Sequence, residues 1–388
     1  MKLKPVITIL LTTITTFTYA SNQFSNDGYT QLLGRSTMNP GYTSIAPFVG
    51  STSDDTTSYF EVHSVFPKVC ITSGDCHHTS YIMGDIVNIK KGEFNNKTDY
   101  DISRVLNINF TPGSQPSLQW LSSDKSGNNY YVMVTSTQNA PALEAFLLKV
   151  YYDSSDKEYK IDRLDSVNIG RGENPSLANL GDNNFIVTSN NTHNSANTPY
   201  LGAYWFSIKT GTNGEPIGIN TPSTMSSYDN GNYAAIAAVG DNKVLETNNG
   251  LNNTLEYTIL ASKNGTFSDN TQLIKSNLNP NQCKNSQGQY TYVQLIPMNQ
   301  ENSQNGEEFL QLYTLKSYPG KLYNRIITYK DGSIECTNSS ISAHTEYNFG
   351  TYPSAFSYDK NKFIEINTGT YMTSSPALYG GIWQYTSV

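Results

Sequence analysis

The chain has 388 residues, and its 32 acidic against 25 basic side chains give a formal net charge of −7. Only five arginines occur and the basic residues form no run, which excludes the clustered Lys and Arg of a nucleic-acid-binding surface. After residue 20 no apolar stretch approaches the length of a membrane helix, so we expect no stable membrane insertion.

The first twenty residues have the pattern of a secretory signal peptide. Lys2 and Lys4 precede an apolar stretch over residues 6–17, and a small-residue approach to a cleavage site ends at Ala20. We therefore expect a mature chain of residues 21–388 that is secreted, periplasmic or displayed on the cell surface. An uncleaved anchor is the alternative, although the stretch is short for a bilayer span.

A short motif recurs six times and divides the chain into six units. We call the reference position of each motif its anchor, and successive anchors are 73, 59, 59, 57 and 62 residues apart: Ser44, Ser117, Ser176, Ala235, Tyr292 and Ser354. Such a period is natural for a four-stranded unit. A glycine stands four residues before the anchor in five units, which predicts a turn with positive φ there: Gly113, Gly172, Gly231, Gly288 and Gly350.

Apolar runs separated by turns predict the strands of each unit. A buried first strand follows every anchor. Second strands are expected at 59–62, 130–135, 185–188, 244–247, 309–314 and 363–366. Third strands are expected at 81–87, 145–150, 203–208, 255–260, 324–329 and 381–385. In the third unit, residues 216–220 are the predicted fourth strand.

The last unit ends after three strands, and its missing strand is expected at the other end of the chain. Residues 29–33 closely echo the fourth-strand segment 271–274, so we expect them to pair beside 381–385 and close a ring. The sequence thus predicts an all-β, six-bladed β-propeller of four-stranded blades in a single domain. The blades are expected at 41–112, 113–171, 172–230, 231–287, 288–349 and 350–388. Seven blades, or a pair of β-sandwiches, are the alternatives.

Four cysteines in an exported chain favour disulfide pairing. Cys70 and Cys76 enclose a short loop within the long first unit, and Cys283 with Cys336 would close the fifth unit. The alternative is a zinc site formed by Cys70, Cys76, His77 and His78. We favour the two disulfides and expect neither a metal nor a cofactor.

One segment resembles the repeats of secreted bacterial propellers. In those repeats a glycine, a Pro-Ser pair and a buried strand precede a Gly-Asp turn and a second strand, as in residues 172–190 here. Residues 115–118 and 352–354 are weaker copies. The resemblance implies a propeller and no particular ligand. The sugar pockets of six-bladed fucose-binding lectins use recurring Arg, Glu and Trp, and this chain has three tryptophans, Trp120, Trp205 and Trp383, and no recurring arginine, so those pockets are not transferred to it.

A column of aromatic and amide residues stands two positions before the anchors. In a propeller this position opens on one face around the central channel, where a tyrosine ring and an amide suit a glycan or a polar protein surface. Packing between neighbouring units is the alternative role of these rings. We call these residues the mouth column: Tyr42, Gln115, Asn174, Tyr233, Tyr290 and Tyr352.

Three glutamates on second strands supply the enzyme hypothesis: Glu61, Glu246 and Glu365. Glycoside hydrolysis needs two carboxylates at a defined separation across a cleft. Glutamates in strands more often face solvent or satisfy backbone groups, and no other catalytic motif is present. The leading hypothesis is therefore a secreted, non-enzymatic protein that recognises a glycan or a surface protein. A glycan-cleaving enzyme and a structural scaffold are the alternatives.

Overall fold

The computed structural model describes twenty segments of the chain: residues 23–33, 40–49, 56–65, 68–72, 75–78, 80–90, 100–104, 113–137, 142–191, 200–223, 226–240, 242–250, 255–262, 273–278, 290–298, 306–315, 318–336, 345–359, 362–369 and 377–386. Within them every regular element is a β-strand, which confirms the all-β prediction. The described part contains no helix long and apolar enough to cross a membrane. The predicted signal peptide lies outside the described residues.

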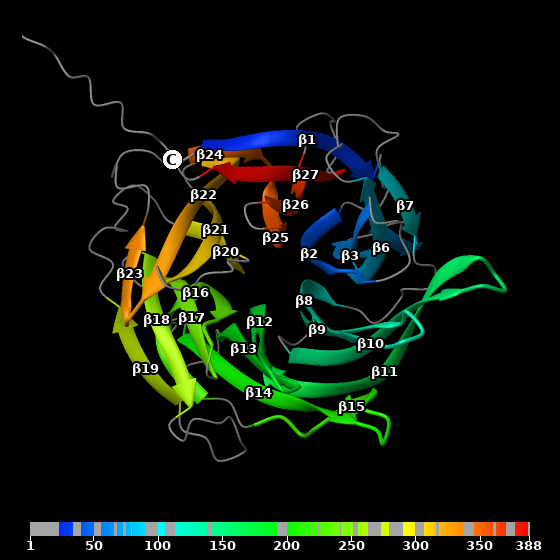
Figure 1. Cartoon of the computed structure of the whole chain (residues 1–388), viewed down its shortest axis with the longest axis horizontal. Helices are drawn as coiled ribbons and strands as arrows, with labels where there is room; N and C mark the ends of the chain where they lie inside the picture. Colours follow the sequence, from blue (N-terminus) through cyan, green and yellow to red (C-terminus); the bar gives the residue numbers. More distant parts are fainter. Residues whose placement is uncertain are drawn as a thin grey trace, which may run out of the picture.

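The sheets are arranged around a central axis, with one strand of each unit innermost (Figure 1). Each inner strand contacts the next along the chain, and the last contacts the first, so the six form a cycle. The inner strands are β2 (Pro40–Pro47), β8 (Ser114–Ser123), β12 (Glu173–Gly181), β16 (Ser226–Ala238), β20 (Tyr290–Pro297) and β25 (Thr351–Asp359).

Antiparallel partners extend each inner strand outward, and they include every second and third strand predicted from the sequence. Their apolar residues form the buried clusters between neighbouring sheets. The second strands are β3 (Thr56–Val65), β9 (Asn129–Ser136), β13 (Asn184–Asn191), β17 (Lys243–Gly250), β21 (Glu307–Leu315) and β26 (Lys362–Gly369). The third strands are β6 (Tyr81–Lys90), β10 (Ala142–Asp153), β14 (Tyr200–Thr210), β18 (Leu255–Ser262), β22 (Tyr318–Lys330) and β27 (Ala377–Thr386).

The outer position differs from unit to unit, and in the third it departs from the prediction. There β15 (Pro216–Ile219) pairs with only one end of β14, while the other end of β14 pairs with the start of β16. The strand β16 then continues as the inner strand of the fourth unit. The remaining outer strands are β7 (Tyr100–Arg104), β11 (Glu158–Arg171), β19 (Leu273–Leu278), β23 (Ser333–Cys336) and β24 (Thr345–Phe349).

The N-terminal strand lies beside the C-terminal one. β1 (Gln23–Leu33) pairs antiparallel with β27, and Tyr29 lies opposite Gly381. The sheet β1-β27-β26-β25 therefore contains both ends of the described chain. The predicted pairing is present, and the strand starts before the predicted residue 29. Because an unpaired outer edge of β27 would be a template for aggregation, this pairing protects the sheet.

The insertion in the first unit is a small hairpin of β4 (Lys68–Thr72) and β5 (Asp75–His78), in which Cys70 lies directly opposite Cys76. The side chains of this hairpin, including His77 and His78, lie outside the described residues. Cys336, at the end of β23, is buried and is not a free cysteine. Cys283 lies outside the described residues, so both cysteine pairings stay predictions.

At the recurring glycine position, an added Cβ would lie too close to the second strand of the same unit, and this explains the glycines better than a requirement for positive φ does. Positive φ was expected at all of them, but among those described only Gly172 (159°) and Gly350 (150°) have it. A Cβ at Gly231 would lie 2.5 Å from Asn248 Oδ1, and the other glycines face the second strand in the same way. Gly113 is the least crowded, with Thr135 Oγ1 at 3.1 Å. Gly288 lies outside the described residues.

Anchor side chains connect neighbouring inner strands around the axis. In each connection the anchor oxygen accepts a hydrogen bond from the backbone N–H one residue past the anchor of the next unit. The donors and acceptors are Leu118 N to Ser44 Oγ (2.9 Å), Leu177 N to Ser117 Oγ (3.0 Å), Ile236 N to Ser176 Oγ (3.1 Å), Ala355 N to Gln294 Oε1 (3.2 Å) and Ile45 N to Ser354 Oγ (3.1 Å). We call these contacts the anchor bridges.

The anchor bridges correct the assignment of the fifth unit. Gln294 makes the bridge there, and its neighbour Leu295 pairs with Gln311 as Ile236 pairs with Glu246 in the fourth unit. The anchor is therefore Gln294, two residues after the predicted Tyr292. With this change the last five anchors are spaced by 59, 59, 59 and 60 residues. The repeat is more regular than the sequence motif suggested.

One bridge is missing because the fourth anchor is Ala235, which has no hydroxyl to accept from Leu295 N–H. We expect Ala235→Ser to supply this acceptor and raise the free energy of unfolding by about 0.5–1.5 kcal/mol. Ser176→Ala should do the reverse, lowering it by about 1–3 kcal/mol, because it leaves Ile236 N–H unpaired. Urea denaturation of both variants against the wild type measures the difference. Equal midpoints for Ser176→Ala and wild type would show that the bridge contributes nothing.

Candidate functional site: the tyrosine mouth

Each inner strand has a β-bulge in the few residues before its anchor. The register of β8 with β9, for example, passes from Ser114 opposite Ser136 to Ser117 opposite Val134, which leaves one extra residue on β8. The same step recurs directly before the anchors of β12, β16 and β25, and before Thr43 in β2. In β20 the shift lies between Tyr290 and Tyr292, so the extra residue is Thr291. A bulge redirects a side chain out of the regular alternation of a strand. In every inner strand except β20 the bulge contains a mouth-column residue.

Four mouth-column residues have left-handed backbone conformations: Gln115 (φ 54°), Asn174 (49°), Tyr233 (53°) and Tyr352 (51°). Such a conformation costs a non-glycine residue on the order of 1–3 kcal/mol unless its surroundings enforce it. Two hydrogen bonds help to enforce it, from Asn174 N to Gln115 Oε1 (2.7 Å) and from Tyr233 N to Asn190 Oδ1 (2.9 Å). Strain that repeats at equivalent positions indicates a required side-chain arrangement.

The column residues surround one end of the central axis, which we call the mouth. Tyr42, Gln115, Asn174, Tyr233 and Tyr292 line a cavity there of about 30 Å³, the share of one water molecule. Tyr352 closes the circle by packing against Tyr42, with ring centroids 3.9 Å apart and ring planes tilted by 35°. The cavity at the mouth is therefore too small for a sugar ring. A ligand would bind on top of the mouth residues and not inside the cavity.

Tyr292 takes the position that the sequence assigned to Tyr290. Its ring lies 5.6 Å from that of Tyr352 and 6.4 Å from that of Tyr42, measured between centroids. Tyr290 lies at the start of β20, and its side chain is outside the described residues. The shift follows from the corrected anchor, since Tyr292 is two residues before Gln294. The pattern of tyrosines in this segment misled the assignment because Tyr290 and Tyr292 both precede apolar strand residues.

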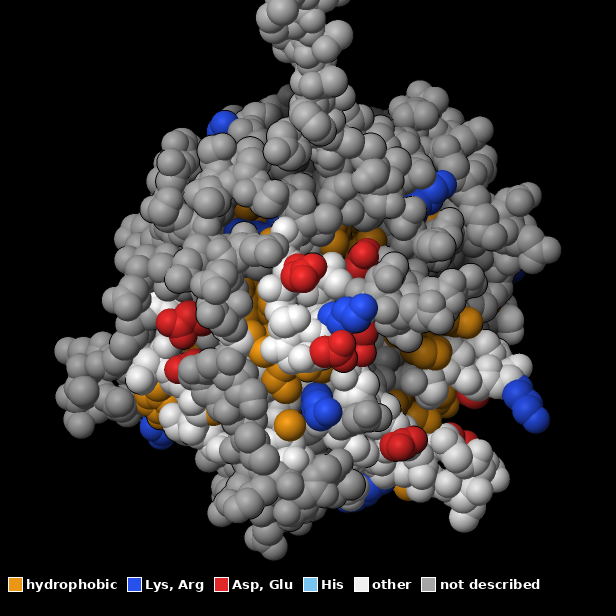
Figure 2. All heavy atoms as spheres, turned by 60° about the vertical axis from the view of Figure 1, so that its left-hand side comes forward, with side chains coloured by type: hydrophobic (Ala, Val, Ile, Leu, Met, Phe, Trp, Pro, Cys, Tyr) orange, Lys and Arg blue, Asp and Glu red, His pale blue; other side chains and the backbone are white. Residues whose placement is uncertain are grey.

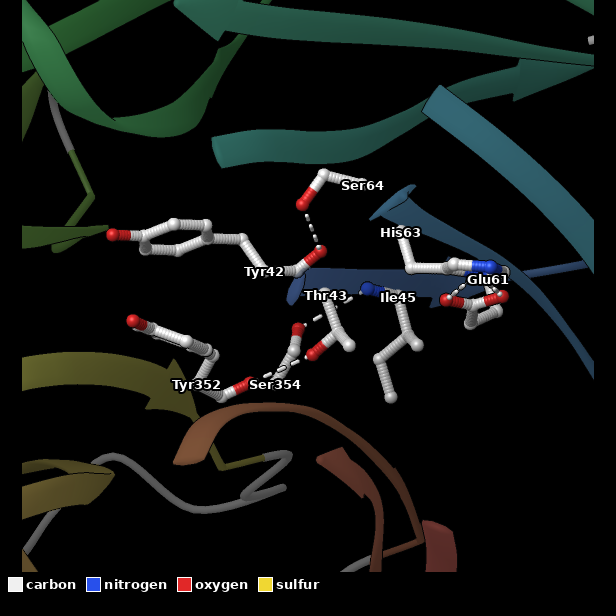
Figure 3. Close-up of polar contacts among 8 residues, drawn as sticks. All are labelled: Tyr42, Thr43, Ile45, Glu61, His63, Ser64, Tyr352 and Ser354. Atoms are coloured by element: carbon white, nitrogen blue, oxygen red, sulfur yellow. Dashed lines mark hydrogen bonds and ion pairs between the residues drawn. The ribbon is translucent and has the colours of Figure 1, made fainter. Parts of the chain in front are cut away.

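Three of the tyrosines pack on each other, so the packing role considered in the sequence analysis applies to Tyr42, Tyr292 and Tyr352. Figure 3 shows the hydroxyls of Tyr42 and Tyr352 pointing to the same side. Tyr42 O and Tyr352 O also accept hydrogen bonds from Ser64 Oγ (3.5 Å) and Thr43 Oγ1 (2.7 Å), respectively. The second of these joins the last unit to the first.

The mouth is polar and uncharged. Burial raises the pKa values of Tyr42 and Tyr292 well above 10, and the nearby Tyr352 adds to the effect, so both phenols remain protonated donors at neutral pH. Among the described residues, Asn174 Oδ1 is buried without a hydrogen-bond partner. Phenol donors beside an unpaired amide acceptor suit a neutral ligand that carries hydroxyl groups.

The three candidate catalytic glutamates do not face a cleft. Glu61, Glu246 and Glu365 are fully buried, and none lines the mouth. Each lies opposite the residue after an anchor, and each has a polar partner two residues further along its own strand. Asn248 Nδ2 donates a hydrogen bond to Glu246 Oε2 (3.3 Å), and Asn367 Nδ2 donates one to Glu365 Oε1 (2.8 Å). In the first unit, His63 Nδ1 lies 2.9 Å from Glu61 Oε1. The glutamates are buried polar residues in three different units and do not face solvent.

Glu61 belongs to a buried group with His63 and Asp85, whose potential metal-ligating atoms lie within 4.8 Å of one another. The backbone register places Asp85 opposite Arg104 on β7. Burial raises the pKa of Glu61 to about 7, although His63 opposes the shift. The folded protein therefore retains a proton on this carboxyl at pH values where the unfolded chain loses it.

This shift predicts a pH dependence of stability with a definite sign. Because the folded-state pKa of about 7 exceeds the ordinary value of 4.5, the contribution of Glu61 is complete below 4.5 and is lost as the pH rises through 7. Glu61→Gln should remove that loss and be more stable than the wild type at pH 8. Thermal unfolding of both proteins from pH 4 to pH 8 tests this. The expectation fails if the two curves stay parallel across the range.

Comparison with known proteins identifies the fold and no family. No family model and no curated protein matches the chain. Among solved structures, a protein of unknown function from Dyadobacter fermentans is similar with a TM-score of 0.53 and 13% identity, covering 94% of this chain and 99% of that one. The Aleuria aurantia lectin in complex with alpha-methyl-L-fucoside has a TM-score of 0.51 and 10% identity, covering 90% and 96%.

A further structure of the Aleuria aurantia lectin is described as a six-bladed β-propeller with a novel fucose recognition mode. It is similar to this chain with a TM-score of 0.51 and 9% identity, and covers 89% of this chain and 95% of the lectin. At these identities the similarity concerns the fold alone. The chain therefore has a propeller fold.

Proposed function

We propose that this chain is a secreted, non-enzymatic recognition protein, a six-bladed β-propeller that binds a neutral glycan on its tyrosine mouth. The observation that carries the proposal is the repeated bulge, which directs tyrosine and amide side chains to one end of the axis in strained backbone conformations. Natural proteins keep such strain mainly at functional sites. The mouth then supplies aromatic faces for the C–H side of a sugar and donors for its oxygens.

The blade count and the compartment are parts of the same proposal. Six cyclically contacting inner strands and the pairing of β1 with β27 support six blades in one domain of residues 21–388. The signal-peptide pattern of residues 1–20 supports export to the periplasm, the cell surface or the medium. Fold neighbours that include a lectin complexed with a fucoside make a glycan the favoured ligand over a surface protein.

Surface charge fits this partner class. On the face in Figure 2, the described Lys, Arg, Asp and Glu side chains are interspersed, without a field of one sign. A nucleic acid would need a basic surface, and an acidic polysaccharide would be favoured by one. A neutral glycan needs neither. The enzyme alternative is weaker, because the buried glutamates lie away from the mouth.

The proposal is tested on a glycan array with the mature protein and two mouth variants, Tyr233→Ala and Tyr292→Ala. We expect each to weaken binding to the recognised glycan at least tenfold, equivalent to about 1.4 kcal/mol, because a stacking face is lost. The matched control is Tyr152→Ala, which removes a tyrosine that is 52% exposed on the β10–β11 hairpin. Circular dichroism of all variants confirms that they are folded.

Two results would overturn this proposal. If both mouth variants bind as tightly as the control, the mouth is not the glycan site. If reducing ends are released from bound glycans and a Glu61→Gln, Glu246→Gln or Glu365→Gln variant abolishes the release, the protein is an enzyme. Absence of binding to every glycan would leave the scaffold alternative.

A further inference from the structure

A second and larger cavity lies on the other side of the anchors. It has a volume of about 230 Å³ and extends along the inner strands from Ser44 and Ser354 to their C-terminal ends near Pro47 and Ser357. Ser117, Ser176 and Gln294 line both this cavity and the mouth, so the anchors form the boundary between the two. Pro297, on its rim, is exposed, so the cavity reaches the protein surface. We call it the axial well.

The lining of the axial well is uncharged. It contains no Asp, Glu, Lys, Arg or His among the described residues. Its lining includes one aliphatic residue from each of five inner strands, at the position after the anchor: Ile45, Leu118, Leu177, Ile236 and Leu295. The side chains of these residues also belong to the buried clusters between neighbouring sheets. Since an ion without a counter-charge is disfavoured in a partly buried site, this lining favours a neutral ligand over an anion or a metal cation. The volume of the well corresponds to about eight water molecules.

The anchor serines leave a ring of hydrogen-bond donors at the base of the well. Ser44, Ser117, Ser176 and Ser354 each accept a backbone N–H in an anchor bridge. No hydrogen bond donated by any of these four hydroxyls occurs within the part of the chain that the structure describes. Each serine hydroxyl is both an acceptor and a donor, and the donor role is therefore unfilled.

Gln119 adds an acceptor to this set. Its Nε2 donates to Leu177 O (3.1 Å), which fixes the amide and leaves Oε1 without a donor among the described residues. The well thus combines four O–H donors, an amide acceptor and aliphatic walls. A purely apolar occupant would leave the donors unpaired, whereas a polar molecule with an apolar face satisfies both parts of the lining.

We infer that the axial well is a second ligand site, separate from the mouth, that takes a single neutral monosaccharide ring. Sugar hydroxyl and ring oxygens accept from the serine hydroxyls, a sugar hydroxyl donates to Gln119 Oε1, and the C–H faces pack on the aliphatic walls. The choice of a sugar over another small polyol rests on the proposed function. The existence of a neutral polar site rests on the lining of the well alone.

The test uses D-glucose, D-galactose, D-mannose, L-fucose and N-acetyl-D-glucosamine as separate ligands of the mature protein. Saturation-transfer NMR and calorimetry measure binding to the wild type, Gln119→Leu, Ser357→Phe and the mouth variant Tyr233→Ala. We expect at least one sugar to bind the wild type. Gln119→Leu should weaken that binding at least fivefold and Ser357→Phe should abolish it by filling the outer end of the well. The control Tyr152→Ala, measured alongside and distant from both cavity linings, should bind as the wild type does.

A second measurement keeps the test decisive if Ser357→Phe does not fold. Methyl-labelled wild-type protein should show sugar-dependent chemical-shift changes at Ile45, Leu118 and Leu177, and Gln119→Leu should reduce them. The inference is overturned if no sugar binds, or if binding depends on Tyr233 and not on Gln119. Glycan-array binding that Tyr233→Ala abolishes while the well stays empty would support the mouth and reject the well. If monosaccharides bind in the well and Tyr233→Ala does not change binding on the glycan array, the mouth is rejected as a site and the well is supported.

Discussion

The anchor bridge is the interaction on which the arrangement around the axis depends. Every inner strand has only one strand partner within its own unit, so its other edge directs backbone N–H and C=O groups toward the axis. A buried N–H without an acceptor costs about 1–3 kcal/mol, and the anchor of the preceding unit supplies that acceptor at five of the six joints. The bridge from Ile45 to Ser354 makes the cycle continuous between the first and last units. The same side chains fix the spacing of the strands and form the boundary between mouth and axial well.

The bulge before each anchor follows from this constraint and creates the mouth. The anchor side chain must point to the inner strand of the next unit. We attribute to this requirement the extra residue that the inner strand contains just before the anchor. In every inner strand except β20 the bulge carries the mouth-column side chain, and at Asn174 and Tyr233 a neighbouring amide oxygen accepts a hydrogen bond from the backbone N–H. The strain of the left-handed conformations is thus offset by contacts between units. The mouth thus forms at one end of the axis from the inner strands themselves.

Buried polar residues on the second strands explain features that the sequence presented as separate. Asn248 and Asn367 donate to Glu246 and Glu365, and their side chains occupy the space that a Cβ at Gly231 or Gly350 would need. The glycine column and the glutamates are therefore two sides of one packing arrangement. The carboxylates of Glu246 and Glu365 are fully buried and accept hydrogen bonds within their own sheets.

The strands and the approximate repeat could be predicted from the sequence, because apolar alternation and turn residues are local signals. The pairing partner of the N-terminal strand could be predicted because residues 29–33 echo a fourth-strand segment and the last unit has only three strands. The sequence did not determine the register of the fifth unit, since Tyr290 and Tyr292 both fit a period of two and only the bridge from Ala355 to Gln294 selects between them. The sequence also did not predict that β15 and the start of β16 pair with opposite ends of β14 in the third unit. Nor did it predict that Glu61, Glu246 and Glu365 are fully buried. The Ala355 to Gln294 bridge joins residues 61 positions apart, and the pairing of β14 with β15 and β16 and the burial of the glutamates also depend on contacts that local sequence patterns do not contain.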